Sequence, residues 1–113
     1  MTIQNWSDDI IVAELSDDPP FTDELATLAD ILQAHPAHVV VNMGQVTYVN
    51  SSNIARLLRL RKQVQAQGRR LVLAGVTNQV WGVFLVTGLD KIFEFTKEVA
   101  LALASLQLTP GPK

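Results

Sequence analysis

Residues 39–67 constrain the fold of this 113-residue chain more than any other stretch. They open with Val39–Val41, an unbroken β-branched run that is short enough to be a buried strand. A turn at 42–44 and a second short β-branched strand at 46–49 are expected to follow. The polar cluster at 50–53 (Asn-Ser-Ser-Asn) then precedes a helical pattern, and such side chains favour helix N-caps. The stretch therefore predicts a chain that leaves a sheet edge and presents two serine hydroxyls at the positive end of a helix.

The remaining sequence alternates between strand and helix patterns. Gly68 is a natural C-terminal stop for the helix after residue 53, and Thr22, Thr96 and either Thr77 or Asn78 are expected N-caps of three others. The other predicted elements are strands at 2–6, 10–15, 70–74 and 91–95 and helices at 22–35, 77–87 and 96–106. A strand, a helix and a strand follow one another from 39 to 74, so these two strands should be parallel with a right-handed crossover.

This pattern predicts one α/β domain over residues 1–107, followed by a flexible tail at 108–113. We expect a mixed sheet of four or five strands with helices mainly on one of its faces. The amino terminus lacks the charged-then-apolar order of a signal peptide, and no apolar run reaches the roughly 18 residues that a membrane helix needs. A cytoplasmic protein without membrane insertion is expected.

Catalytic chemistry has little support in the composition. The chain contains no cysteine, which excludes disulfides, thiolate nucleophiles and cysteine-based zinc sites. His35 and His38 are the only histidines; neither has a second-ligand spacing around it, so both are expected to be ordinary surface or boundary residues. No phosphate-binding glycine loop occurs, and Asp17-Asp18 before two prolines suggests a solvated turn. We therefore expect no catalytic residue, no metal and no cofactor.

Charge is unevenly distributed along the chain. The net charge is −2, but residues 1–50 hold eight acids and no Lys or Arg, whereas residues 51–70 hold six bases and no acid. One interpretation is a solvated helix face, which is the more common meaning of such a run. The other is a basic surface beside the serines, including Arg56, that meets an acidic partner or a nucleotide phosphate. Nucleic acid is not an expected partner, because the chain is acidic overall and no aromatic residue interleaves these bases.

The helix expected at 78–87 is apolar on nearly all sides, with Trp81 and Phe84 among its large side chains. A helix that lies on a sheet should be amphipathic. Two interpretations stay open: either part of this helix is an exposed partner surface, or the C-terminal segment covers it.

Three segments resemble a known family. The stretch NMGQVTYVNSSNIARLL resembles the central motif of the STAS domain, especially that of bacterial anti-sigma factor antagonists, and the segments RRLVLAGV and VTGLDKIFEF are similar to the family's following strand and S/T-G-L region. The resemblance implies that Ser51, and less readily Ser52, is phosphorylated by a partner serine kinase that is also the anti-sigma factor. Phosphorylation would break the complex. The family's motif has aspartate and glycine where this chain has Asn50 and Asn53.

Three functional hypotheses follow. The first is a phosphorylation-switched antagonist of an anti-sigma factor, and the second is a non-phosphorylated adaptor subunit of a transporter ATPase or a stress-signalling complex. The third, a small hydrolase or nucleotide-processing enzyme, rests only on Ser51 and the nearby bases. The expected partner is an anti-sigma factor serine kinase or a related ATPase, and a homodimer is possible. The residues expected to bind it are Asn50, Ser51, Ser52, Asn53, Arg56, Trp81 and Phe84.

Overall fold

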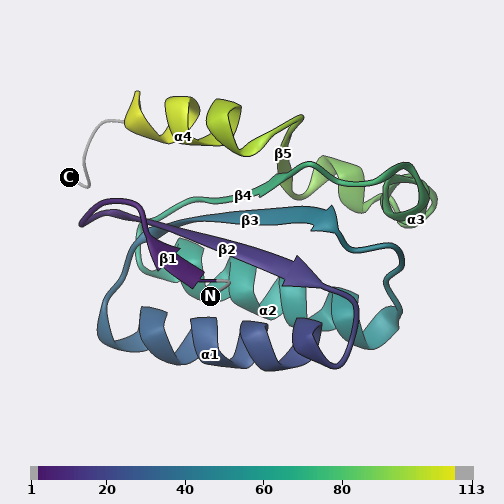
Figure 1. The fold of residues 1–113 in the computed structure, drawn as a ribbon, viewed down its shortest axis with the longest axis horizontal. Coiled ribbons are helices and arrows are strands. Elements are labelled where there is room, and N and C mark those ends of the chain that lie inside the picture. Colours follow the sequence, from purple (N-terminus) through teal and green to yellow (C-terminus); the bar gives the residue numbers. More distant parts are fainter. Residues whose placement is uncertain (1–2, 109–113) are drawn as a thin grey trace.

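A computed structural model shows a five-stranded sheet with helices on both faces (Figure 1). The structure describes residues 3–108, and none of the helices in this range is long and apolar enough to cross a membrane. The elements are β1 Ile3–Asn5, β2 Ile10–Ser16, α1 Pro20–Ala34, β3 His38–Gln45, α2 Ser51–Ala66, β4 Leu71–Ala74, α3 Asn78–Thr87, the 3-10 helix η1 Leu89–Lys91, β5 Glu94–Thr96 and α4 Val99–Gln107.

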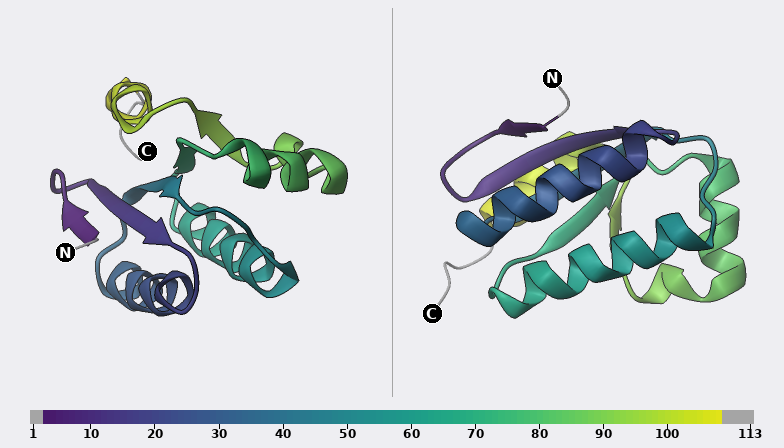
Figure 2. Two further views of the ribbon diagram at one scale, coloured as in Figure 1. Left: turned by 45° about the vertical axis from the view of Figure 1, so that its right-hand side comes forward. Right: turned by 90° about the horizontal axis from the view of Figure 1, so that it is seen from below.

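The strands lie in the sheet in their order along the chain. β1 is antiparallel to β2, and β2, β3, β4 and β5 are parallel to one another. Each crossover between parallel strands carries a helix, and a shared right-handed sense brings these helices to one face. α1 and α2 lie side by side there, whereas α4 covers the opposite face (Figure 2). The predicted α/β domain with a mixed sheet and most helices on one face is confirmed.

The central strand β3 separates two apolar cores. Successive side chains of a strand point to opposite faces, so Val39, Val41 and Met43 join the large core under α1 and α2, while Val40 joins a smaller core with α4. All four side chains are fully buried. Burial on both faces explains why the sequence of β3 opens with an uninterrupted apolar run.

The prediction for residues 42–49 was wrong in detail. β3 continues to Gln45 through the expected turn, and residues 46–49 form no strand. The backbone N–H groups of Thr47 and Tyr48 donate to the carboxylate of Asp17 at 2.8 and 3.5 Å. A side chain therefore takes the place that a neighbouring strand would fill.

Two predicted helix caps were also wrong. α1 begins at Pro20, which suits the first helical position because proline has no backbone N–H that would need a partner. Thr22 lies inside the first turn, and its backbone N–H donates to the Asp18 carboxylate at 3.1 Å. Thr96 ends β5 rather than capping α4, and its hydroxyl donates to the carbonyl oxygen of Glu98 at 2.9 Å. Thr77 and Gly68 take the predicted positions before α3 and after α2, Gly68 with a positive φ of 73°.

Three further predictions differ from the structure or fall outside it. His38 is buried at the start of β3, where its Nδ1 accepts from the backbone N–H of Arg70 at 3.0 Å, so it is not a surface residue. The strand predicted at 91–95 is shorter and later, because Lys91 belongs to η1. The tail predicted at 108–113 lies, apart from Leu108, outside the described residues.

Candidate functional site

The polar cluster at 50–53 lies at the edge of the sheet where β2, β3 and β4 end (Figure 1). Loops 17–19, 46–50 and 75–77 leave the strands there. Two of these loops are joined directly, because the Thr77 hydroxyl donates to the carbonyl oxygen of Val46 at 2.9 Å. The carboxyl ends of parallel strands are where α/β folds usually place functional groups, so this edge is the candidate site.

Asn50 and Asn53 together form the cap that starts α2. Asn50 Oδ1 accepts from the backbone N–H of Asn53 at 2.8 Å, and Asn53 Oδ1 accepts from the backbone N–H of Asn50 at 3.0 Å. This is a capping box built from two asparagines. Asn53 is only 3% exposed and is used inside the fold, so the prediction that it contacts a partner directly is corrected.

Ser51 and Ser52 are the first two residues of α2, and both are exposed. Neither hydroxyl makes a hydrogen bond to another residue within 3–108. The first turn of α2 contains no acidic residue, so the positive end of the helix is not neutralised by its own sequence. The structure thus places the two serine hydroxyls where the sequence predicted them.

Asp17 and Asp18 hold this edge together, although the sequence suggested only a solvated turn. The Asp17 carboxylate accepts from the Thr47 hydroxyl at 2.6 Å as well as from the backbone of 47 and 48. The Asp18 carboxylate accepts from the Asn53 side-chain amide at 2.9 Å and from the Thr22 hydroxyl at 2.7 Å. The two acids therefore connect the end of β2 with the loop after β3 and with the start of α2.

These hydrogen bonds also set the ionisation of the two acids. The Thr47 hydroxyl and backbone N–H hold the pKa of Asp17 below its ordinary value of 3.8. The Asn53 amide, followed by Thr22, lowers the pKa of Asp18 in the same way. Both carboxylates are therefore charged at neutral pH. The sequence did contain one signal for this arrangement. The acids directly follow a buried strand, and the serines follow the neighbouring parallel strand, so both groups should lie at the same end of the sheet.

Arg56 is the base nearest to this edge on α2. It is half-buried, lines a small cleft of about 120 Å³ between α1 and α2, and its charge helps to lower the pKa of Asp18. Arg59 and Lys62 are exposed, but Arg61 donates through Nε to the carbonyl oxygen of Ile92 at 3.2 Å. The basic run is therefore divided between solvated side chains and side chains that support the fold.

The two predicted aromatic contact residues of α3 differ in exposure. Phe84 is fully buried and packs edge-on against Phe93 and Phe95, with ring centroids 5.8 and 5.3 Å apart. The prediction that Phe84 meets a partner is therefore corrected, because the segment after α3 covers it. Trp81 is half-exposed and packs edge-on against Phe95 at 4.9 Å. Leu85 and Val86, which the sequence analysis did not single out, are 51% and 89% exposed.

Metal chemistry has no visible basis at this edge. Among residues 3–108, no group of three or more His, Cys, Asp or Glu side chains could hold a metal ion. The chemistry that the edge does offer is a pair of exposed hydroxyls, a helix N-terminus and two ionised carboxylates.

Comparison with known proteins identifies the family. The family model of the STAS domain matches residues 4–102. The chain belongs to the STAS family. An anti-sigma-factor antagonist (STAS) domain protein from Planctomyces limnophilus superposes on this STAS domain with a TM-score of 0.79 at 20% identity, covering 93% of this chain and 97% of that one. The anti-sigma factor antagonist SpoIIAA in its unphosphorylated form superposes with a TM-score of 0.77 at 15% identity, covering 96% of this chain and 97% of that one.

The Bacillus cell fate determinant SpoIIAA has also been solved in a phosphorylated form. That structure matches this STAS domain with a TM-score of 0.70 at 16% identity, covering 91% of this chain and 96% of that one. Similarity at such identities shows a common fold. The capping box explains how this STAS domain keeps the helix start with Asn50 and Asn53 in place of the family's aspartate and glycine.

Proposed function

We propose that this STAS domain is a non-enzymatic regulatory module that binds a protein partner and is switched by phosphorylation of Ser51. The observation that carries the proposal is the exposed Ser51 hydroxyl at the first position of α2, which no residue in 3–108 binds. A kinase needs a hydroxyl that is accessible in this way. The existence of a phosphorylated form of SpoIIAA, a protein of similar fold, supports the proposal.

A phosphate on Ser51 would be tolerated by the domain itself. The first backbone N–H groups of a helix lack intrahelical partners, and the helix dipole favours negative charge there. No acidic residue in the first turn of α2 opposes it. The fold should therefore survive phosphorylation, and the effect should fall on the partner.

The complex with the partner would respond differently. Phosphorylation adds about 1.5 to 2 negative charges where a neutral hydroxyl had been. Asp17 and Asp18 are already ionised at the same edge, with Arg56 as the nearest base on α2, so the added charge makes the edge more negative. A partner surface that fits an uncharged serine would lose affinity, because it would have to desolvate the phosphate or face it with like charge.

The proposed contact surface combines Asn50, Ser51, Ser52, Arg56 and Trp81. All five are exposed or half-exposed, and the Thr77–Val46 hydrogen bond keeps α3 beside the serine loop. Tyr48, which is 55% exposed in the same loop, extends this surface and was not predicted from sequence. The proposed partner is an anti-sigma factor serine kinase or a related ATPase.

A second candidate function is favoured by the exposed apolar end of α3. Leu85 and Val86 could be covered permanently by a partner, as in an adaptor subunit of a transporter ATPase or of a stress-signalling complex. A second copy of the chain could cover them as well. In the adaptor function, Ser51 would have no regulatory role.

Intact-mass spectrometry tests the first function directly. The full chain is incubated with ATP and the kinase-like protein encoded nearest to its gene, in parallel with Ser51→Ala and Ser52→Ala variants. We expect one added phosphoryl group on the wild type and on Ser52→Ala, and none on Ser51→Ala. An equal gain in all three, or no gain in any, would rule out Ser51 as the acceptor.

The adaptor function gives a different pattern in binding experiments. A stable complex with a neighbouring gene product that is lost in Leu85→Asp but retained in Ser51→Asp would favour the adaptor. A complex that is lost in Ser51→Asp but retained in Leu85→Asp would favour the phosphorylation switch. Phe84 variants are unsuitable for this comparison, because the side chain is fully buried.

A further inference from the structure

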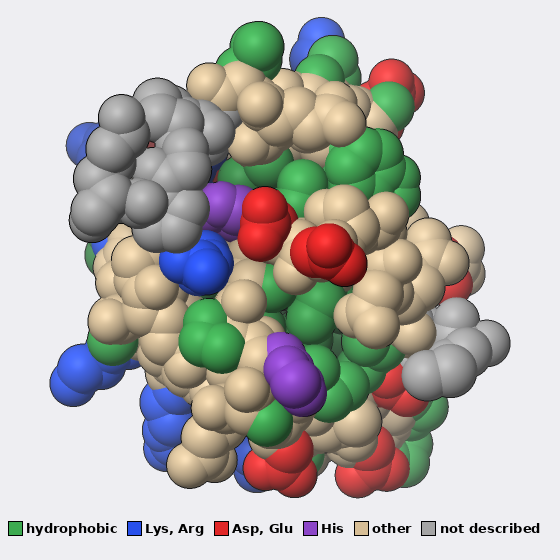
Figure 3. All heavy atoms as spheres, turned by 90° about the vertical axis from the view of Figure 1, so that its left-hand side faces the viewer, with side chains coloured by type: hydrophobic (Ala, Val, Ile, Leu, Met, Phe, Trp, Pro, Cys, Tyr) green, Lys and Arg blue, Asp and Glu red, His purple; other side chains and the backbone are tan. Residues whose placement is uncertain are grey.

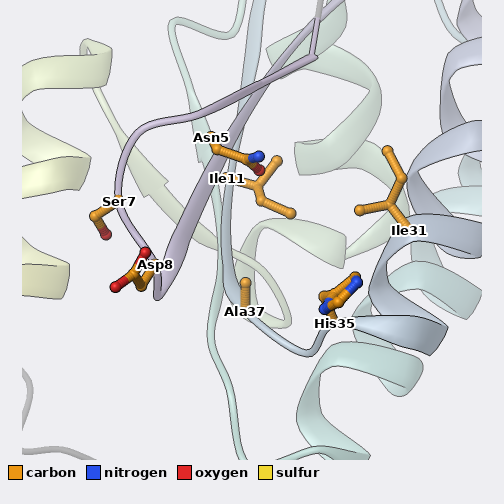
Figure 4. Close-up of a pocket in the computed structure, with 7 residues that line it drawn as sticks. All are labelled: Asn5, Ser7, Asp8, Ile11, Ile31, His35 and Ala37. Carbon is orange, nitrogen blue, oxygen red and sulfur yellow. The ribbon is translucent and has the colours of Figure 1, made fainter.

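A separate cavity lies at the opposite end of the sheet from Ser51. It has a volume of about 410 Å³ and is bounded by the β1–β2 hairpin, the last turn of α1 and the residue before β3 (Figure 4). This volume is within the usual range of small-molecule sites. The 15 residues of α1 span roughly 22 Å between the two ends, so a ligand here would not touch the serine cluster.

The floor of this cavity is apolar. Ile11 from β2 and Ala37 are buried, and Ile31 from α1 is half-buried and faces them across the cavity. Figure 3 looks at this end of the molecule and shows hydrophobic side chains at the bottom of a hollow, with acidic and histidine side chains around it and Lys or Arg side chains farther to one side. Such a floor suits an aromatic ring or a short aliphatic chain.

The rim carries polar groups with free hydrogen-bonding capacity. Asn5, Asp8 and His35 are exposed, and their side chains make no hydrogen bond or ion pair with another residue in 3–108. Ser7 Oγ accepts from the backbone N–H of Asp9 at 3.2 Å. Four of the seven lining residues are therefore polar, and they can orient a small ligand that rests on the three apolar ones.

The charged groups at the rim indicate whether the ligand is a cation or an anion. Asp8 is the one carboxylate that lines the cavity, and no Lys or Arg is among its lining residues. The last turn of α1 ends beside it without a basic residue, so the partial negative charge of the helix C-terminus is not offset by its own sequence. Two guanidinium groups lie at the same end of the sheet without lining the cavity: Arg70 is paired with Glu94, and Arg69 donates to the carbonyl oxygen of Gln67 at 3.4 Å. These features favour a cation over an anion.

We propose that this cavity binds a small organic ammonium compound. Its apolar body would lie on Ile11, Ile31 and Ala37, and its ammonium group would pair with the Asp8 carboxylate at the rim. The site does not depend on phosphorylation of Ser51, and the proposal stands or fails separately from the proposed function.

Phenethylamine is a suitable probe, because it combines a benzene ring with one ammonium group. In a ¹H–¹⁵N correlation titration of the full chain, we expect saturable shifts at the amides of Ile11, Ile31, His35 and Ala37, with those of Ser51 and Ser52 unchanged. A probe of this size should bind with a dissociation constant on the order of 1 mM. Phenylacetate, which has the same ring and the opposite charge, should cause no saturable shift at these amides.

Two charge variants separate a specific site from general attraction to an acidic protein. Asp8→Asn should weaken phenethylamine binding by about two- to fivefold, as expected for an exposed ion pair. Asp23→Asn, an equal charge change on an exposed residue at the other end of α1, should leave it unchanged. The proposal would be overturned by non-saturable or dispersed shifts, by equal effects of the two variants, or by phenylacetate binding as well as the amine.

Discussion

Asn53 connects the start of α2 with the loop that follows β2. Its backbone and side chain complete the capping box with Asn50, and its amide Nδ2 donates to Asp18 at the end of β2. The serines depend on this residue for their position, because they lie between the two asparagines of the box. A residue that departs from the family motif therefore supports the site structurally.

Removing this side chain should destabilise the fold. Asn53→Ala keeps the Asn50 cap but loses the hydrogen bond that the Asn53 side chain accepts from the backbone N–H of Asn50. It also loses the hydrogen bond to the charged Asp18 carboxylate, so we expect the free energy of unfolding to fall by about 1 to 3 kcal/mol. Ser52→Ala, an exposed position in the same turn, should change it by less than about 0.5 kcal/mol. Urea unfolding of both variants measures this, and equal stabilities would contradict the role assigned to Asn53.

His38 should give the stability of the fold a pH dependence near neutrality. Burial, followed by the charges of Arg69 and Arg70, lowers the pKa of His38 below its ordinary value of 6.5. The folded state therefore prefers the neutral ring, and the unfolded state takes up more protons as the pH falls below 6.5. Stability should be greatest above this pH and should decrease as the pH falls toward the lowered pKa.

Thermal unfolding between about pH 7.5 and pH 5.5 tests this, since the window spans the ordinary pKa of histidine. The wild type and His35→Leu should both lose stability over this range, because His35 is exposed. His38→Leu should start from a lower stability and show a flatter profile. If stability changes with pH by the same amount in His35→Leu and His38→Leu, His38 is not the cause of the pH dependence.

At the scale of elements, the loop at 46–49 is held by a side chain instead of a strand. Asp17 binds the backbone N–H of Thr47 and Tyr48 and the hydroxyl of Thr47. Asp17→Asn removes the charge from these hydrogen bonds, so the Thr47 amide should exchange with solvent faster by on the order of tenfold. The wild type should show the same loosening as the pH falls below 3.8 through the lowered pKa of Asp17.

Hydrogen-exchange mass spectrometry or NMR reports on this loop directly. Asp23→Asn provides the matched control, since Asp23 is exposed in the first turn of α1 and its carboxylate makes no hydrogen bond to the loop among residues 3–108. Unchanged exchange at Thr47 in Asp17→Asn would mean that the buried Val46 and Val49 and the Thr77–Val46 hydrogen bond hold the loop in place without Asp17.

α3 has one side that supports the core and one side that is exposed. Phe84→Ala removes a fully buried ring from the cluster with Phe93 and Phe95, and we expect a loss of about 3 to 5 kcal/mol. Leu85→Ala, at a side chain that is 51% exposed, should cost less than about 1 kcal/mol. Denaturant unfolding distinguishes the two, and a small effect of Phe84→Ala would show that the ring is not part of the core.

At the scale of the whole molecule, the sequence predicted most of the architecture. The apolar run at Val39–Val41, the helix that follows Ser51 and the glycine at 68 are local signals, and each appears where expected. The exposed serines were also predictable, because a helix start is encoded by residues adjacent in sequence.

Contacts between distant segments were not predictable in this way. Asp17 and Asp18 bind residues that are 30 and 35 positions away. Their position directly after a strand indicates the end of the sheet at which they lie, but not which residues they bind. Phe84 belongs to a helix of correct extent, but its burial depends on Phe93 and Phe95 from the segment that follows. Periodicity identified the helix and could not show which of its apolar sides would be covered.

The most direct test of the central proposal compares the affinity of the partner for the same chain before and after phosphorylation of Ser51. Isothermal titration calorimetry with the purified partner is suitable, and circular dichroism of both forms confirms that the fold is unchanged. We expect affinity to fall by at least about tenfold on phosphorylation, because the added charge is placed at the proposed contact surface. Equal affinities of the two forms would contradict the account.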